Sequence, residues 1–202
     1  VVDELCRTPA SGDLMLTNYQ NYQKIRNGII VEYNKNGKKT SNILRLLSYN
    51  DALSNTFTVA SQMWIKGETH WRRPDLIIFI NGFPMGFIEL KNSNIPVKNA
   101  YDINLKNYLK DIPYLFNYNQ ICVLSNGMET RLGSFAAGYE FFFEWLKVEN
   151  EKENPDRKAI RENCTSLEYF IAGLFEPKNL VDYIVNFILY DRRRIKIIAK
   201  NH

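Results

Sequence analysis

The chain has 202 residues, of which 26 are lysine or arginine and 22 are aspartate or glutamate, so its net charge is +4. This length suffices for one domain with a substantial core, or for one domain with a small helical annex. The charge is compatible with binding a polyanion but does not by itself indicate one. No apolar run approaches the length of a membrane span, so a soluble, cytoplasmic protein without a membrane partner is expected.

The scarcity of cysteine and histidine argues against several kinds of site. The three cysteines, Cys6, Cys122 and Cys164, show no CxxC spacing, which disfavours a disulfide framework or a thiolate zinc site and favours free thiols. The only histidines are His70 and His202, so Ser-His-Asp and Cys-His enzymes have few candidate residues.

The first third of the chain is predicted to contain one helix followed by strands. Residues 13–25 fit a helix, and residues 29–33 fit a strand that ends in a turn at 34–37. A short apolar run at 43–47 and an alternating stretch from 57 to about 65 follow.

The clearest local element is a β-hairpin between Asp75 and Lys91. Residues 76–80 form a dense β-branched and aromatic run, residues 81–82 are Asn-Gly, which accepts positive φ, and residues 85–90 form a second apolar run. Because both runs are apolar on both faces, a central, covered hairpin is expected.

Helices dominate the prediction for the remaining chain. A helix at about 97–110 is limited by Pro113, and a short strand is expected at 121–125. The aromatic segment 139–148 is predicted to be helical, and the charged stretch 149–157 to be a surface linker.

Two further helices are predicted near the C-terminal end. Thr165 and Glu168 fit a capping box, and a second helix begins after Pro177. The pattern therefore predicts an α/β protein, with a mixed central sheet flanked by helices in residues 1–148 and a helical annex in residues 149–202.

Three charged residues are expected to meet at the open end of the hairpin. Glu89 and Lys91 are two apart on one strand and so share a face, while the hairpin folds Asp75 back toward them. Carboxylates hold Mg²⁺, or Mn²⁺ in its place, and the carbonyl of Leu90 is placed to be another oxygen ligand. A neighbouring lysine can orient or deprotonate the attacking water and offset charge on a phosphate. This set fits metal-dependent phosphodiester hydrolysis.

A structural ion pair between Glu89 and Lys91 is the alternative interpretation. For an isolated E-x-K triplet that interpretation would be favoured, because strands contain many such triplets. The Pro74-Asp75 dipeptide and the hairpin at the right interval favour the nuclease interpretation instead.

The pattern Pro74-Asp75 followed by Glu89-Leu90-Lys91 resembles the PD-(D/E)xK nuclease signature. A wider set of segments resembles the N-terminal nuclease domain of the R subunit of type I restriction-modification enzymes. The resemblance covers most of the chain from about Asn27 onward, and its most similar segments are 72–75, 81–84, 87–91, 112–119 and 124–127.

The resemblance implies a restriction-endonuclease-like core in which Asp75 and Glu89 are metal ligands and Lys91 is the catalytic lysine. Members of the family also carry a Gln-x-x-x-Tyr motif on the helix after the lysine, and Asn104 and Tyr108 have that spacing here. Because asparagine replaces glutamine, an accessory role of residue 104 stays open, and Tyr108 fits a packing aromatic equally well.

The resemblance also implies an ATP-dependent complex with methyltransferase and specificity subunits that cleaves foreign double-stranded DNA. No GxxxxGK[ST] phosphate loop occurs, so the ATP that the full-length enzyme requires is not bound by this chain. The family normally has an upstream acidic residue near the metal, for which Glu4 and Glu32 are both candidates. The alternative function is a nuclease-fold module that binds DNA or docks partner subunits without cutting.

Several remaining residues have two interpretations. Arg72 and Arg73 are candidates for contacts with DNA phosphates, although a solvated strand end is nearly as well supported. Trp64 and Trp71 are expected in the core rather than as base-stacking platforms. The basic segment 192–200 could follow a DNA backbone, but such runs are more often a solvated surface.

Overall fold

A mixed six-stranded sheet forms the centre of the protein in the computed structural model, which describes residues 5, 12–145, 148, 162, 164–192 and 195–198. The strand order is β10-β9-β8-β7-β6-β3, and every neighbouring pair is antiparallel except β7 with β8. The expected α/β class is therefore confirmed. The strands are β3 (Phe57–Ser61), β6 (Leu76–Ile80), β7 (Phe83–Leu90), β8 (Ile121–Ser125), β9 (Thr130–Gly133) and β10 (Phe143–Glu144).

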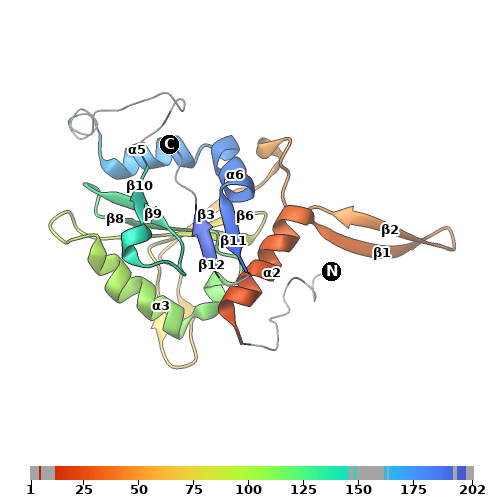
Figure 1. Ribbon diagram of the computed structural model, residues 1–202, viewed down its shortest axis with the longest axis horizontal. Helices are drawn as coiled ribbons and strands as arrows, with labels where there is room; N and C mark the ends of the chain where they lie inside the picture. Colours follow the sequence, from red (N-terminus) through yellow and green to blue (C-terminus); the bar gives the residue numbers. More distant parts are fainter. Residues whose placement is uncertain are drawn as a thin grey trace.

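Helices cover both faces of this sheet, and three two-stranded ladders lie outside it (Figure 1). The helices are α2 (Leu14–Asn27), α3 (Lys106–Asp111), α5 (Ser166–Leu174) and α6 (Pro177–Asn186), and a π-helical segment, Ala100–Leu105, leads directly into α3. Short 3-10 turns are Ala52–Ser54, Pro113–Phe116 and Tyr139–Phe141. The ladders pair β1 (Ile29–Lys35) with β2 (Lys38–Leu44), β4 (Ile65–Lys66) with β5 (Trp71–Arg72), and β11 (Ile188–Asp191) with β12 (Ile195–Ile198).

Alternate residues of the central strands face two separate apolar clusters. Ile88 belongs to the cluster that contains buried residues of α2, α5 and α6, whereas Phe87 belongs to the cluster that contains residues of the π-helical segment and α3. Successive side chains of a strand point to opposite faces, so a strand covered on both sides must be apolar at nearly every position. This burial explains the continuous apolar runs and confirms the predicted central hairpin, β6–β7.

The turn of this hairpin has the backbone conformation that its sequence predicts. Asn81 and Gly82 have φ values of +51° and +83°, as a two-residue type I′ turn requires. The Asn81 side chain donates to the Leu46 carbonyl at 2.9 Å and accepts from the Thr56 amide at 2.8 Å. The turn is therefore fixed to the segments that precede and follow the Ala52–Ser54 turn.

The helix predicted for residues 139–148 is wrong over its described part. After a single 3-10 turn the chain forms β10, which pairs with the edge of β9. Phe142 lies directly over Gly133, where an added Cβ would be 2.5 Å from the Phe142 ring. Arg131 also donates to the Phe142 carbonyl at 2.9 Å. These nonlocal contacts override the local helical preference of the aromatic run.

The C-terminal segment is only partly helical. The Thr165–Glu168 capping box is present, and α6 begins at Pro177, as predicted. The hairpin β11–β12 then follows, so a purely helical annex is wrong. Buried residues of α5 and α6 lie in the same apolar cluster as strands of the central sheet. The linker expected at residues 149–157 lies outside the described residues.

The cysteines and the helices bear on two further expectations. Cys122 and Cys164 are free thiols, as expected, and Cys6 is outside the described part of the chain. Of the helices that the structure describes, none combines the length and the apolar character needed to cross a membrane.

A buried lysine joins β12 to the main body. Lys196 is 3% exposed and its ammonium donates to Asn18 Oδ1 at 3.2 Å, to the Asn119 carbonyl at 2.6 Å and to Gln120 Oε1 at 3.0 Å. All three acceptors are neutral, and burial lowers the pKa of Lys196 to about 7. Both interpretations of the segment 192–200, DNA contact and a solvated surface, are therefore wrong for Lys196, because its side chain is enclosed.

The substitution Lys196→Met tests this burial through the pH dependence of stability. The pKa of Lys196 falls from 10.5 to about 7 on folding. Between these values the unfolded chain binds a proton that the folded protein does not, so the free energy of unfolding rises with pH, by at most about 1.4 kcal/mol per pH unit. Below pH 7 both states are protonated and this contribution to the slope disappears.

Urea denaturation of both proteins from roughly pH 6 to pH 9 would measure the effect. The unfolding free energy of wild type minus that of Lys196→Met is expected to increase above about pH 7. A difference that is constant over this range would contradict a depressed pKa of Lys196.

Candidate active site

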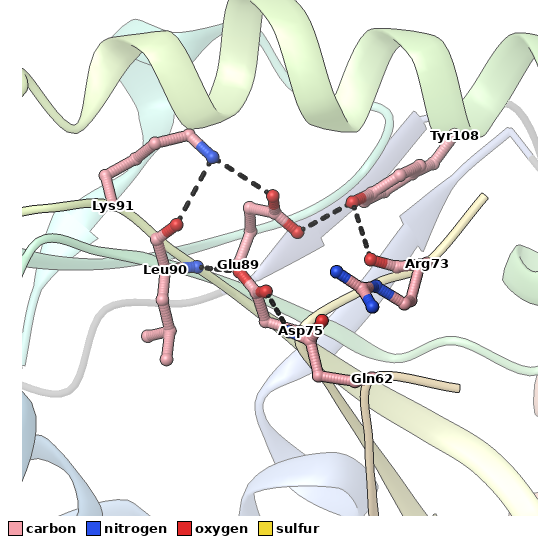
Figure 2. Close-up of polar contacts among 7 residues, drawn as sticks. All are labelled: Gln62, Arg73, Asp75, Glu89, Leu90, Lys91 and Tyr108. Atoms are coloured by element: carbon pink, nitrogen blue, oxygen red, sulfur yellow. Dashed lines mark hydrogen bonds and ion pairs between the residues drawn. The ribbon is translucent and has the colours of Figure 1, made fainter. Parts of the chain in front are cut away.

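The open end of the β6–β7 hairpin brings three charged residues together (Figure 2). Asp75 directly precedes β6, Glu89 lies at the end of β7, and Lys91 follows it. Asp75 Oδ2 accepts a hydrogen bond from the Leu90 amide at 2.8 Å, which ties the beginning of one strand to the end of the other. The convergence expected from the hairpin is thus present in the structure.

Glu89 is a buried carboxylate with two charged or polar partners. It is 2% exposed, and its Oε1 lies 3.1 Å from Lys91 Nζ while its Oε2 accepts from the Tyr108 hydroxyl at 3.0 Å. Burial, and then the nearby negative charge of Asp75, raises the pKa of Glu89, whereas Lys91 and Tyr108 act in the opposite direction. The site therefore favours binding of additional positive charge.

Lys91 lies between two of the oxygens expected to bind a metal. Its ammonium donates to Glu89 Oε1 at 3.1 Å and to the Leu90 carbonyl at 3.2 Å (Figure 2). The Glu89–Lys91 ion pair of the structural interpretation is therefore present. The same contacts show that this point between the two oxygens accommodates a cation.

A residue that the sequence analysis did not identify also contacts the site. The Gln62 side chain donates from Nε2 to Asp75 Oδ1 at 2.5 Å, and the Gln62 backbone N–H donates to the Asp75 carbonyl at 2.8 Å. Gln62 directly follows β3 and has a φ of +53°, a left-handed backbone conformation that is uncommon for residues other than glycine. Only the pairing of β3 with β6 brings it near Asp75, so no local sequence signal indicates it.

Tyr108 contacts the site as well as the core. Its ring packs edge-on against Phe87, at 5.9 Å between centroids, while its hydroxyl donates to Glu89. Burial and the charge of Glu89 raise the pKa of Tyr108 far above its usual value, so this hydroxyl stays a donor. The neighbouring Asn104 side chain acts in the opposite direction and lowers the pKa of Tyr108. Asn104 lies in the π-helical segment, a backbone form that is frequent at functional sites.

The two arginines before the hairpin have different environments. Arg72 Nε lies 2.6 Å from Asp111 Oδ2, so its guanidinium is paired with a buried carboxylate, while 29% of the Arg72 side chain stays exposed. Arg73 is exposed, and its guanidinium carbon lies 5.1 Å from the centroid of the Trp64 ring. The core placement expected for Trp64 and Trp71 is wrong, since these side chains are 61% and 57% exposed.

The donor set fits a hard divalent cation. Asp75, Glu89 and the Leu90 carbonyl supply only oxygen atoms, which Mg²⁺ and Mn²⁺ prefer. In the described part of the chain, no group of three or more histidine, cysteine, aspartate or glutamate residues could hold a metal ion. Of the two candidates for a further acid, Glu32 is exposed on the β1–β2 hairpin and Glu4 is outside the described residues.

The substitution Tyr108→Phe removes the hydrogen bond to Glu89 and keeps the ring. Since that bond stabilises the charged carboxylate, its loss is expected to raise the pKa of Glu89 further. Titration of the Glu89 carboxyl by carbon-13 NMR in metal-free protein would measure this change. Tyr101→Phe is the matched control, because Tyr101 is on the same helix but donates to the Ala137 carbonyl. An equal pKa in wild type and Tyr108→Phe would rule out the contact.

The known proteins to which this chain is similar are subunits of type I restriction enzymes. The family model for the type I restriction enzyme R protein N terminus matches residues 1–141. The HindI endonuclease subunit of Haemophilus influenzae is 35% identical over 201 residues, which cover 95% of this chain and 18% of that protein. The putative MjaIXP endonuclease subunit of Methanocaldococcus jannaschii is 33% identical over 189 residues, which cover 86% of this chain and 18% of that protein. The chain thus spans less than a fifth of either relative, and it belongs to the family of type I restriction enzyme R protein N-terminal domains.

Proposed function

We propose that this chain is the Mg²⁺-dependent endonuclease domain of a type I restriction-modification R subunit. Its substrate would be foreign double-stranded DNA, cleaved after ATP-driven translocation by other parts of the full-length protein. Methyltransferase and specificity subunits would be its partners. The observation that carries the proposal is the cluster of two carboxylates, one carbonyl and one ammonium at the open end of the hairpin. The names of the relatives, all type I endonuclease subunits, support the same conclusion.

Two carboxylates and a carbonyl would hold the cation in a PD-(D/E)xK arrangement. Bound Mg²⁺ would polarise the phosphate and make a water molecule more nucleophilic. Asp75 is held in position by the Leu90 amide and Gln62, and Glu89 by Tyr108, so both carboxylates are oriented before a ligand arrives. Such preorganisation avoids part of the cost of ordering the ligands on binding.

Lys91 would change its partners when the site is loaded. Glu89 and the Leu90 carbonyl, which both contact the Lys91 ammonium in this structure, would hold the cation instead. The Lys91 side chain is then free to reach a phosphate oxygen or the attacking water. There it would offset negative charge that develops during cleavage, or orient the attacking water.

A module that binds DNA or partner subunits without cutting is the second candidate function. The observation that favours it is the lack of a third acidic side chain near Asp75 and Glu89 in the residues that the structure describes. The two candidates differ in whether the purified chain can cut DNA at all.

A plasmid-nicking assay with the isolated chain tests the proposal. We expect slow nicking without sequence preference that requires Mg²⁺ or Mn²⁺, because a charge of +4 gives only a weak, salt-sensitive hold on phosphate. Nicking should disappear in Asp75→Asn and Glu89→Gln. Cleavage at one defined sequence would contradict the type I assignment, and metal-independent nicking would contradict the proposed site.

The substitution Lys91→Ala tests the division of labour in the complete enzyme. Cleavage is expected to fall by at least about 100-fold, because a positioned acid–base group contributes that much or more. ATP hydrolysis and DNA binding should persist, since the proposed motor lies outside this chain. The matched control is Lys98→Ala, which removes an exposed lysine paired with Asp102. Loss of ATP hydrolysis in correctly folded Lys91→Ala would count against this assignment.

A further inference from the structure

We propose that residues 64–73, here termed the tryptophan finger, form a DNA-contacting surface directly beside the candidate active site. The finger consists of Trp64, the β4–β5 ladder and Arg73. It would hold the sugar–phosphate backbone and accessible base faces next to the phosphate that is cut. This inference rests on the proposed function for its choice of ligand, but it concerns residues outside the metal-binding cluster.

The strand register divides the finger into two faces. Ile65 pairs with Arg72, and Lys66 pairs with Trp71. Ile65 is 7% exposed and the Arg72 guanidinium binds the buried carboxylate of Asp111, so this pair faces inward. Opposite residues of an antiparallel pair share a face, and side chains alternate along each strand. Lys66 and Trp71 therefore face outward.

The flanking residues extend the outward face. Trp64 and Arg73 are each two positions from a member of the outward pair, so they lie on the same side. Their mutual contact, at 5.1 Å from guanidinium carbon to ring centroid, confirms that they are opposite each other. All four outward residues are exposed, and the face thus presents two tryptophans, each opposite a basic residue: Trp64, Lys66, Trp71 and Arg73.

The finger has a fixed base. Besides the Arg72–Asp111 ion pair, the Tyr114 hydroxyl donates to the Lys66 carbonyl. Gly67 approaches the end of α3 so closely that an added Cβ would lie 2.2 Å from the Asp111 carbonyl oxygen. The exposure of both tryptophans is therefore a property of a well-anchored hairpin. Two large adjacent aromatic side chains left in water on such a frame indicate a binding surface.

The charges on this face identify a nucleic-acid strand as the occupant. Indole rings stack on bases and pack on sugars, and interleaved basic side chains contact phosphates. Glu68 is the only acidic residue of the finger, and it lies in the turn between the two strands. Arg73 is followed by Pro74 and Asp75, so the outward face leads directly to the proposed metal ligands, and Figure 2 shows Arg73 next to Asp75 and Tyr108.

Equilibrium binding of DNA to the chain in EDTA at low salt tests the finger separately from cleavage. The probes are a fluorescently labelled duplex and the corresponding single strand, followed by anisotropy. Trp64→Ala with Trp71→Ala is expected to weaken binding at least about fivefold per tryptophan. If the variant loses affinity only for the single strand, the tryptophans stack on unpaired bases. If it loses affinity for both probes, they contact the sugar–phosphate backbone. Unchanged affinity for both probes, or wild-type protein that binds neither, would overturn the proposal.

Control variants separate the finger from general effects on the fold. Tyr33→Ala removes an aromatic side chain, 41% exposed, from the β1–β2 hairpin, which projects away from the body in Figure 1, and should bind like wild type. The double variant Trp64→Phe, Trp71→Phe should bind DNA with most of the wild-type affinity. A loss as large as that of the double alanine variant would exclude ring contacts. Unlabelled DNA should also quench tryptophan emission in wild type but not in the double alanine variant, whose remaining Trp145 is 9% exposed. Finger-dependent binding without nicking would support the candidate module that binds DNA without cutting and would leave the finger intact.

Discussion

Burial of the Glu89 carboxylate is the constraint on which the arrangement around the site depends. An ionised carboxylate that is 2% exposed is stable only when other groups compensate for the water it has lost. Lys91 supplies charge from the same strand, and Tyr108 supplies a hydrogen bond from the helix above. Asp75 acts in the opposite direction, because its charge raises the pKa of Glu89. Asp75 and Glu89 together carry one more negative charge than the Lys91 ion pair neutralises, so a bound cation would complement this end of the strands.

The parts of the structure that could be predicted depend on neighbours in sequence. The β6–β7 hairpin follows from two apolar runs around Asn81-Gly82, and the start of α5 follows from the Thr165–Glu168 capping box. The approach of Asp75 to Glu89 follows only in part from the same hairpin. The two-residue turn sets Ile80 opposite Phe83, and a β-bulge between Ile78 and Phe79 then shifts the register by one residue, so that Leu76 pairs with Ile88 and Asp75 lies opposite Glu89. The apolar runs and the turn therefore predict that the charged ends of the two strands meet, whereas the bulge that sets Asp75 opposite Glu89 was not predicted.

The parts that could not be predicted depend on residues far apart in the chain. Gln62 reaches Asp75 only because β3 pairs with β6, and residues 139–144 fail to form a regular helix because Phe142 packs on Gly133. The exposure of Trp64 and Trp71 has the same origin. A tryptophan is ordinarily a core residue, but here the burial of Ile65 and the Arg72–Asp111 ion pair place the opposite face of the short ladder in water.

The C-terminal hairpin is connected to the strand that carries Glu89 by a continuous set of buried polar contacts. Lys196 donates to the Asn119 backbone carbonyl and to Gln120 Oε1. The backbone N–H of Gln120 in turn donates to the Met85 carbonyl in β7 at 2.6 Å. Separating β12 from the body would leave the buried acceptors of Asn18, Asn119 and Gln120 without the ammonium that donates to them, which is costly in a low-dielectric interior. The hairpin and β7 are therefore expected to behave as one rigid unit.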